Sequence, residues 1–183
     1  MKKGNIIILN GVSSAGKTTF AKALQGQLSQ PYFHMDVDVF CLMAPEKFGK
    51  DGDYSVQWEF VSNMFHAVKL FSDMGFNLVV PCIFDNGDFL KNCIMLLHEY
   101  PVLFVHVKCP LNELRRREAA RGDRNVGMAE TLLSTLYPRD TPYDITVNTF
   151  SDTTEECANI IVEKLNSSDE FTAFETLWMQ MKS

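Results

Sequence analysis

Apolar and polar positions change period repeatedly along this chain. Short apolar runs with the length of buried strands lie at 5–10, 32–35, 77–81, 102–108 and 145–148. Between them, apolar residues recur three or four positions apart, which predicts amphipathic helices at 17–29, 55–74, 89–98, 110–120, 128–136, 153–165 and 171–181. Strands that alternate with helices favour right-handed βαβ units and a parallel sheet covered on both faces. The pattern therefore predicts an α/β protein.

One segment has no regular period. Residues 41–54 contain Pro45, Gly49 and Gly52, which indicate a loop. In a parallel α/β sheet, ligands bind beyond the carboxyl ends of the strands, and the second strand ends shortly before this segment. We therefore expect residues 41–54 to form a loop over a binding site.

The connection between the first strand and its helix carries the most specific motif. Residues 11–18 read Gly-Val-Ser-Ser-Ala-Gly-Lys-Thr, which matches the Walker A pattern G-x-x-x-x-G-K-[ST] at every fixed position. In such a loop, backbone N–H groups and the dipole of the following helix bind phosphate. The lysine reaches the β- and γ-phosphates, and the Ser/Thr hydroxyl, here that of Thr18, ligates Mg²⁺.

A chance glycine-rich turn is the alternative interpretation of this octet. The apolar strand before it and the helix after it count against chance, because phosphate binding requires that context. The motif therefore predicts a site for a nucleoside triphosphate with Mg²⁺. Its residues would be Gly11, Val12, Ser13, Ser14, Ala15, Gly16, Lys17, Thr18 and Thr19.

Two acidic residues follow the second strand at its carboxyl end. Asp36 and Asp38 are two positions apart, so in an extended segment both side chains would point to one side. Phosphoryl transfer to a hydroxyl needs a carboxylate that takes the hydroxyl proton, and Asp38 is the candidate for this base. Solvated loop residues or helix caps are the alternative, because acidic residues are common at strand ends.

A cluster of arginines follows the fourth strand. It consists of Arg115, Arg116, Arg117, Arg121 and Arg124. Arg117 and Arg121 are four positions apart and therefore share a helical face. With Gly122 as a hinge, residues 115–127 suit a lid that closes over phosphates and stabilises transition-state charge. A solvated charged face is the alternative, because acidic residues are interleaved at Glu113, Glu118 and Asp123.

Composition limits the possible partners. The 183 residues suffice for a single α/β domain over 1–183. A net charge of −6 argues against nucleic acid as the main partner. No apolar stretch approaches the roughly 18 residues of a membrane span, and the apolar run after Lys2 and Lys3 is too short for a signal peptide. The five scattered cysteines contain no C-x-x-C pair, which is typical of reduced thiols. We therefore expect a cytoplasmic protein with no membrane partner.

Several segments resemble the chloramphenicol phosphotransferase-like proteins, a family of P-loop kinases. The run 7–17 is similar to the opening of these proteins, and residues 117–124 with 127–129 are similar to their lid. Further similarity lies at 143–145 and 156–158. The resemblance implies a kinase-like P-loop fold and ATP-dependent transfer of the γ-phosphoryl group to a hydroxyl. It also implies that Asp38 is the catalytic aspartate and that the lid arginines are Arg117, Arg121 and Arg124.

The chain departs from the family pattern on one side of the expected site. Where the family carries two aspartates at the end of the third strand, this chain has Pro81 and Cys82. Asp85 is a candidate substitute, and Asp36 stands where the family has a small residue. Residues 41–71 show little similarity. The phosphoryl-donor half therefore carries over better than the acceptor half, and chloramphenicol itself is not implied as the acceptor.

Together these observations predict a P-loop kinase with three α/β/α layers and a mainly five-stranded parallel sheet. ATP and Mg²⁺ are the expected cofactors, a small-molecule hydroxyl is the expected acceptor, and residues 41–72 are the expected cap over that acceptor. The catalytic residues would be Lys17, Asp38, Arg121 and Arg124, with Arg117 at the nucleotide. Alternatives are a kinase of nucleotides, nucleotide sugars or other metabolites, and a non-catalytic nucleotide-binding module. The absence of Asn-Lys-x-Asp counts against a GTPase.

Overall fold

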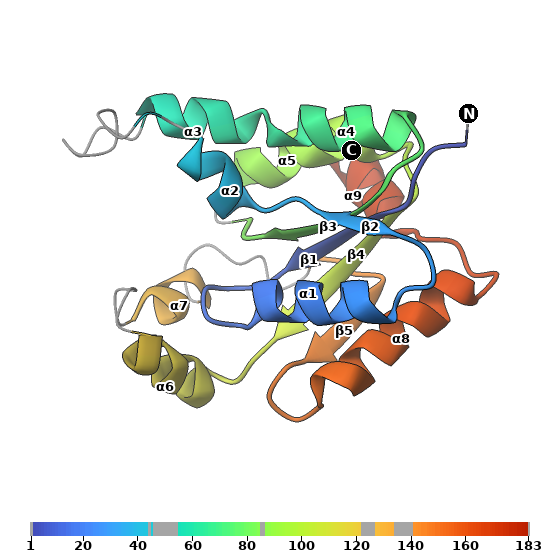
Figure 1. The fold of residues 1–183 in the computed structure, drawn as a ribbon. Helices are drawn as coiled ribbons and strands as arrows, with labels where there is room; N and C mark the ends of the chain where they lie inside the picture. The colour runs from blue at the N-terminus through green and yellow to red at the C-terminus, as the bar shows by residue number, and fades with distance from the viewer. Residues whose placement is uncertain are drawn as a thin grey trace.

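The computed structural model describes residues 2–43, 45, 55–84, 87–121, 127–133 and 141–182. In this part of the chain, five parallel strands form one sheet in the order β2-β3-β1-β4-β5 (Figure 1). Their bounds are Ile6–Asn10 for β1, Tyr32–His34 for β2, Asn77–Cys82 for β3, Val102–Lys108 for β4 and Ile145–Asn148 for β5. The predicted parallel α/β sheet is confirmed.

Helices cover both faces of the sheet, which gives the predicted three layers (Figure 1). One face packs against α3 (Ser55–Ser62), α4 (Met64–Asp73), α5 (Gly87–Leu97) and α9 (Ala173–Lys182). The other packs against α1 (Lys17–Gln27), α6 (Leu111–Arg121), α7 (Met128–Thr131) and α8 (Thr154–Asn166). None of the described helices combines the length and the apolar character of a membrane span.

The central strand β1 is buried on both faces of the sheet, which accounts for its continuous run of apolar residues. Ile6 and Ile8 belong to the core beneath α4 and α5, whereas Ile7 and Leu9 belong to the core beneath α1 and α8. Successive side chains of a strand point to opposite faces, so a strand covered on both sides is apolar at every position. The same argument applies to β4, where Val102 and Phe104 lie in the first core and Leu103 and Val105 in the second.

A short helix follows β2 where the sequence predicted an extended segment. It includes the first two residues of the loop predicted over 41–54, of which 44 and 46–54 lie outside the described residues. α2 spans Val37–Leu42 and is capped by Asp36, whose carboxylate accepts a hydrogen bond from the Asp38 N–H at 2.8 Å. Aspartate is a preferred N-cap because its side chain satisfies an amide that the helix leaves unpaired. The alternative interpretation of Asp36 as a helix cap is therefore confirmed.

The long helix predicted from residue 55 is two helices. α3 ends at Ser62 and α4 begins at Met64, with Asn63 between them. The hydroxyl of Ser62 and the amide of Asn63 both donate to the Glu59 carbonyl oxygen, at 2.7 and 2.8 Å. Side chains that bond nearby carbonyls in this way compete with the helical ladder, which explains the break. Of the helix predicted over 128–136, α7 covers Met128–Thr131 and the next two residues continue as a π-helical turn, whereas 134–136 lie outside the described residues.

Replacing two glycines with alanine is expected to have opposite effects on the free energy of unfolding. A Cβ at Gly4 would lie 2.0 Å from the Phe76 carbonyl oxygen, whereas a Cβ at Gly26 in α1 would meet nothing within 4 Å. Gly4→Ala is expected to lower the free energy of unfolding by about 1–3 kcal/mol, because backbone must move. Gly26→Ala is expected to raise it by up to about 1 kcal/mol, because alanine favours helix. Urea unfolding of both variants measures the difference. A Gly4→Ala protein as stable as wild type would contradict the close approach to Phe76.

Candidate active site

The loop between β1 and α1 contains three positions with unusual backbone requirements. Gly16 N-caps α1 with a φ of 88°, and Ser14 has a φ of 61°, both in the left-handed region that residues other than glycine seldom adopt. A Cβ at Gly11 would lie 2.6 Å from the Val107 carbonyl oxygen. The backbone therefore turns tightly at the carboxyl end of β1, as a loop that gathers its N–H groups around an anion must do.

Lys17, the first residue of α1, folds back over this loop. Its Nζ donates hydrogen bonds to the carbonyl oxygens of Gly11 at 2.8 Å and Val12 at 3.0 Å. The ammonium therefore lies at the N-terminus of α1. Its positive charge and the helix dipole both favour an anion at this place. The loop, the lysine and the helix end combine as the Walker A motif predicts.

The Asp36 carboxylate lies beside the hydroxyl of Thr18. Thr18 Oγ1 donates to Asp36 Oδ2 at 3.4 Å, and His34 Nε2 lies 3.4 Å from the same oxygen, at ion-pair distance but without hydrogen-bond geometry. Burial raises the pKa of Asp36, but the His34 ring, the Asp38 amide and the Thr18 hydroxyl outweigh burial, so its pKa is lower than usual. Asp36 is therefore a nearly buried, ionised carboxylate next to the loop.

Asp38 lies in the first turn of α2 and is exposed. It lines the same cavity as Asp36, Lys17 and Thr18. The two aspartates therefore lie together at the loop, as the sequence led us to expect. The reason differs from the expected one, because Asp36 caps a helix and Asp38 belongs to that helix.

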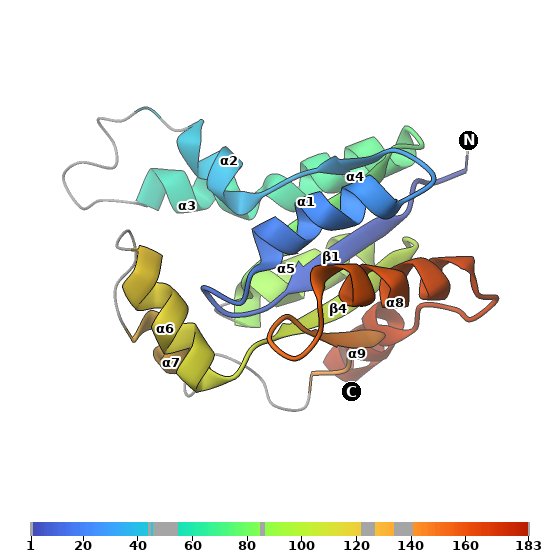
Figure 2. The same ribbon diagram turned by 60° about the horizontal axis from the view of Figure 1, so that its bottom comes forward.

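This cavity has a volume of about 340 Å³. We call it the α2–α7 cavity, because α2 and α7 contribute to its walls from opposite sides. Figure 2 shows α2 and α3 facing α6 and α7 at this end of the sheet. Besides the loop and the aspartates, its walls contain the mainly apolar residues Val37, Cys41, Pro81, Cys82, Ile83, Phe89, Met128 and Leu132.

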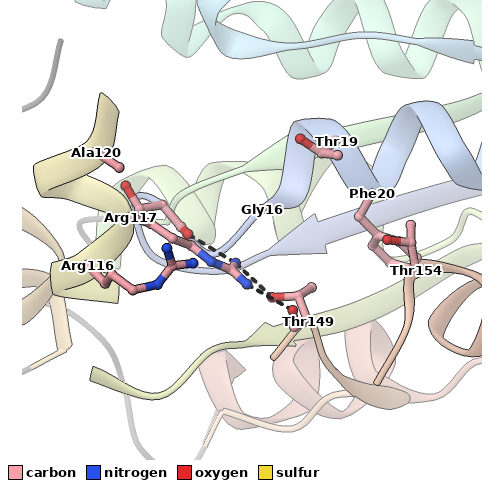
Figure 3. A pocket seen from close by; sticks show the side chains of 9 residues that line it. Gly16, Thr19, Phe20, Arg116, Arg117, Ala120, Thr149 and Thr154 are labelled. Carbon is pink, nitrogen blue, oxygen red and sulfur yellow. Dashed lines mark hydrogen bonds between the residues drawn. The ribbon is translucent and has the colours of Figure 1, made fainter. Parts of the chain in front are cut away.

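A second cavity, of about 380 Å³, lies on the other side of the loop (Figure 3). We call it the α6–α8 cavity, because Arg116 and Arg117 of α6 line it together with Thr154 of α8. Ser14, Gly16 and Thr19 line both cavities. The Walker A loop is therefore a wall shared by an arginine-lined cavity and a carboxylate-lined one.

Arg117 connects α6 to the loop and to the end of β5, as Figure 3 shows. Its guanidinium donates to the Thr149 carbonyl oxygen at 2.9 Å, to the Thr149 hydroxyl at 3.3 Å and to the Ser14 carbonyl oxygen at 3.4 Å. The Thr149 hydroxyl in turn donates to the Ala15 carbonyl oxygen at 2.7 Å. Arg117 is thus held against the Walker A backbone.

Sequence reasoning did not single out Thr149. It follows β5 directly, at the carboxyl end of the last strand. The available signal was positional, because ligand sites in parallel sheets use residues at that edge.

The acidic residues of α6 are not part of a solvated face. Glu113 is 7% exposed and pairs with Arg116 and Arg117, at 2.7 and 2.8 Å. Those arginines lower the pKa of Glu113 to about 2. Glu118 is 1% exposed, and its carboxylate accepts the N–H groups of Gly127 and Ala129 at the start of α7. The acids therefore orient Arg117 and anchor α7, which contradicts the solvated-face alternative for these two residues.

Several residues singled out in the sequence cannot be placed in the site, because they or their side chains lie outside the described part of the chain. Arg121 ends α6, and its side chain is outside the described part of the chain, as are Arg124 and Asp85 entirely. Pro81 and Cys82 lie at the end of β3, where the family pattern has aspartates, and both are buried in the wall of the α2–α7 cavity.

A Walker A loop at the central strand of a parallel β2-β3-β1-β4-β5 sheet, with a carboxylate beside its threonine, defines a P-loop kinase fold. The protein is accordingly a phosphotransferase of the P-loop kinase type. Within that class, the chain belongs to the chloramphenicol phosphotransferase-like family, whose sequence profile matches residues 4–166.

Relatives of this chain are kinases or are named as phosphotransferases. A Mycobacterium tuberculosis protein provisionally named an O-phosphotransferase is 25% identical over 97% of this chain and 89% of its own length. The adenylyl-sulfate kinase of Clostridium acetobutylicum is 25% identical over 90% of this chain and 84% of its own. The shikimate kinase of Bacteroides fragilis is 35% identical, over 46% of this chain and 50% of its own.

The fold is shared with the solved structures of a kinase and of an antibiotic resistance protein. The APS kinase of Mycobacterium tuberculosis, solved with AMPPNP and APS, superposes with a TM-score of 0.68 at 18% identity, covering 91% of this chain and 100% of that one. The tunicamycin resistance protein of Deinococcus radiodurans gives a TM-score of 0.68 at 22% identity, covering 91% and 98%. At these identities the likeness establishes the fold.

Proposed function

We propose that this protein transfers the γ-phosphoryl group of ATP to a hydroxyl of a small molecule, with Mg²⁺ as cofactor. The observation that carries the proposal is the Walker A loop shared by two cavities of opposite character. The α6–α8 cavity, with Arg116 and Arg117, would hold the nucleoside side of ATP, and the α2–α7 cavity, with Asp36 and Asp38, would hold the acceptor. The phosphates would cross the loop between them.

The loop residues suit a triphosphate. Backbone N–H groups of residues 11–16, with Thr19 at the start of α1, would surround the phosphate oxygens. Lys17 Nζ, which now bonds two loop carbonyls, would turn to the β- and γ-phosphates. Arg117 would contribute positive charge from the α6 side. Arg121 and Arg124, with the lid over 115–127, would complete the charge stabilisation when the lid closes.

Thr18 and Asp36 suit a magnesium ion. Their oxygen atoms lie 3.4 Å apart, and hydroxyl and carboxylate oxygens are ligands that Mg²⁺ prefers. The described residues contain no cluster of three or more His, Cys, Asp or Glu side chains that could hold a metal by itself. Kinase sites seldom need one, because Mg²⁺ is held by one or two protein oxygens with phosphates and water. The ion would supply charge neutralisation at the β- and γ-phosphates.

Asp38 is the proposed general base. The acceptor oxygen would attack the γ-phosphorus in line, the bond from that phosphorus to the bridging oxygen of ADP would break, and the hydroxyl proton would pass to the Asp38 carboxylate. Asp36 would remain ionised beside the metal. Residues 41–72 would form the cap that closes the acceptor side, within one domain over 1–183.

Turnover over a defined acceptor panel tests the proposed function. Small alcohols, antibiotics, nucleotides and nucleotide sugars would be incubated with Mg²⁺ and ATP, and ADP release and phosphorylated products would be measured by a coupled assay and mass spectrometry. Acceptor-dependent ADP release with a matching product supports the kinase. Binding of ATP without transfer to any acceptor would instead favour a non-catalytic nucleotide-binding module.

The metal role of Thr18 gives a prediction that needs no acceptor. Thr18→Val keeps the shape of the side chain but removes its oxygen, so the gain in ATP affinity that Mg²⁺ provides is expected to fall about 10-fold or more. Calorimetric titration of ATP with Mg²⁺ and with EDTA measures that gain. Thr18→Ser retains the hydroxyl and is the matched control. An undiminished gain in Thr18→Val would remove Thr18 from the metal site.

A further inference from the structure

The described walls of the α2–α7 cavity are poor in positive charge. Two carboxylates, Asp36 and Asp38, and one ammonium, that of Lys17, are the charged groups among its described lining residues. The Lys17 ammonium lies on the Walker A backbone, bonded to the Gly11 and Val12 carbonyl oxygens, so it belongs to the phosphate side. By contrast, two guanidinium groups line the α6–α8 cavity.

The remaining surface of the α2–α7 cavity is apolar. Val37 and Cys41 of α2, Cys82 at the end of β3, and Met128 and Leu132 around α7 contribute to it. Burial and the nearby carboxylates of Asp38 and Asp36 raise the pKa of the Cys41 thiol, which therefore stays neutral at physiological pH. These side chains favour contact with apolar groups.

Other apolar side chains of α2 lie outside the cavity lining and are exposed. None of the six residues of this helix is buried, although four are Val, Phe or Leu. Val39 is 56% exposed and Leu42 is 83% exposed, and the ring of Phe40 packs on that of Phe60, which is itself 42% exposed. Exposed apolar side chains of this kind are candidates for contact with a ligand that extends beyond the cavity.

We infer that the acceptor is an alcohol without negative charge, neutral or cationic, whose apolar body lies against α2 and α7. The inference rests on the proposed function, because it concerns the acceptor of that reaction. An anionic acceptor would face the Asp38 carboxylate and the triphosphate of ATP, and like charges placed together in an interface disfavour binding. Shikimate and adenylyl sulfate, named for two relatives, are anions of the kind that these walls disfavour.

Fractionated extracts test the charge of the acceptor before the acceptor itself is identified. A microbial small-molecule extract would be separated at pH 7 into an anion pool and a flow-through pool, and the latter into apolar and polar parts by reverse-phase chromatography. Each pool would be incubated with the protein and γ-³²P-ATP. Transfer of label to a product from the apolar flow-through pool is expected. Transfer confined to the anion pool or to the polar pool would overturn the inference.

A charge variant tests the same inference within the wall. Met128 is 40% exposed and lines the cavity, so Met128→Arg places a guanidinium there without filling the core. The ratio of labelled product from the anion pool to that from the flow-through pool is expected to rise about 10-fold or more. Met179→Arg, on the exposed side of α9, is the matched control. An unchanged ratio in Met128→Arg would show that the acceptor does not contact α7.

Failure of the inference and failure of the proposed function give different results. If the function fails, no pool accepts label although calorimetry still detects bound ATP with Mg²⁺. If only the inference fails, label is transferred, but from the anion pool or from the polar pool. Both results contradict the inference, and only the first contradicts the kinase reaction.

Discussion

Replacing Asp38 with asparagine is expected to lower the rate of acceptor phosphorylation by about 10²- to 10⁴-fold, the effect of losing a general base. The amide has the shape of the carboxylate but cannot take the hydroxyl proton. The substitution should preserve the local fold, because the cap of α2 uses the backbone N–H of Asp38 and the carboxylate of Asp36. The loss should therefore fall on kcat.

Two measurements separate this effect from a structural one. The kcat would be measured with the best acceptor of the panel, and ATP affinity with Mg²⁺ by calorimetry. ATP affinity is expected to stay within about twofold of wild type, because the proposed donor site lies on the loop and α6 side. Asp169→Asn, an exposed aspartate after α8, is the control. Full turnover in Asp38→Asn would assign the base to another residue.

Replacing Lys17 with methionine is expected to lower turnover by about 10²- to 10³-fold, as the loss of a preorganised charge at the transferring group does in other enzymes. Methionine keeps much of the apolar stem but has no ammonium for the β- and γ-phosphates. Unlike Asp38→Asn, this variant should also bind ATP more weakly, because the ground-state phosphates lose the same contact.

The control for Lys17→Met lies on the same helix. Lys22 is exposed in α1, and Lys22→Met changes the charge and the length of the side chain identically. Its turnover and ATP affinity are expected to match wild type. Equal activity in Lys17→Met would contradict the phosphate role, and equal losses in both variants would indicate a general effect of net charge.

The phosphate loop could be predicted because its signal is local. Glycines at 11 and 16, a lysine and a hydroxyl are adjacent in the sequence, and the tight approach of Gly11 to Val107 and the left-handed Gly16 explain why those residue types are required. The sheet could be predicted for a similar reason, since a strand buried on both faces must be apolar throughout. Neither inference depends on contacts between distant residues.

The missed features depend on side-chain hydrogen bonds and on distant contacts. The break at Asn63 comes from bonds to the Glu59 carbonyl, and α2 depends on the cap by Asp36, both of which override a periodic pattern. Thr149 meets Ala15, 134 residues earlier, and no local pattern reports that contact. Glu118 looks like a surface acid in the sequence, but it becomes buried because it anchors the amides of α7.

The wall that the two cavities share has a consequence for kinetics under the proposed reaction. Ser14, Gly16 and Thr19 line both cavities. A ligand bound in one cavity would therefore contact residues that also line the binding site in the other. Linkage then requires that nucleotide and acceptor alter each other's dissociation constants by one common factor. Under the proposed reaction we therefore expect substrate synergism, which would appear as a Michaelis constant for either substrate that changes with the concentration of the other.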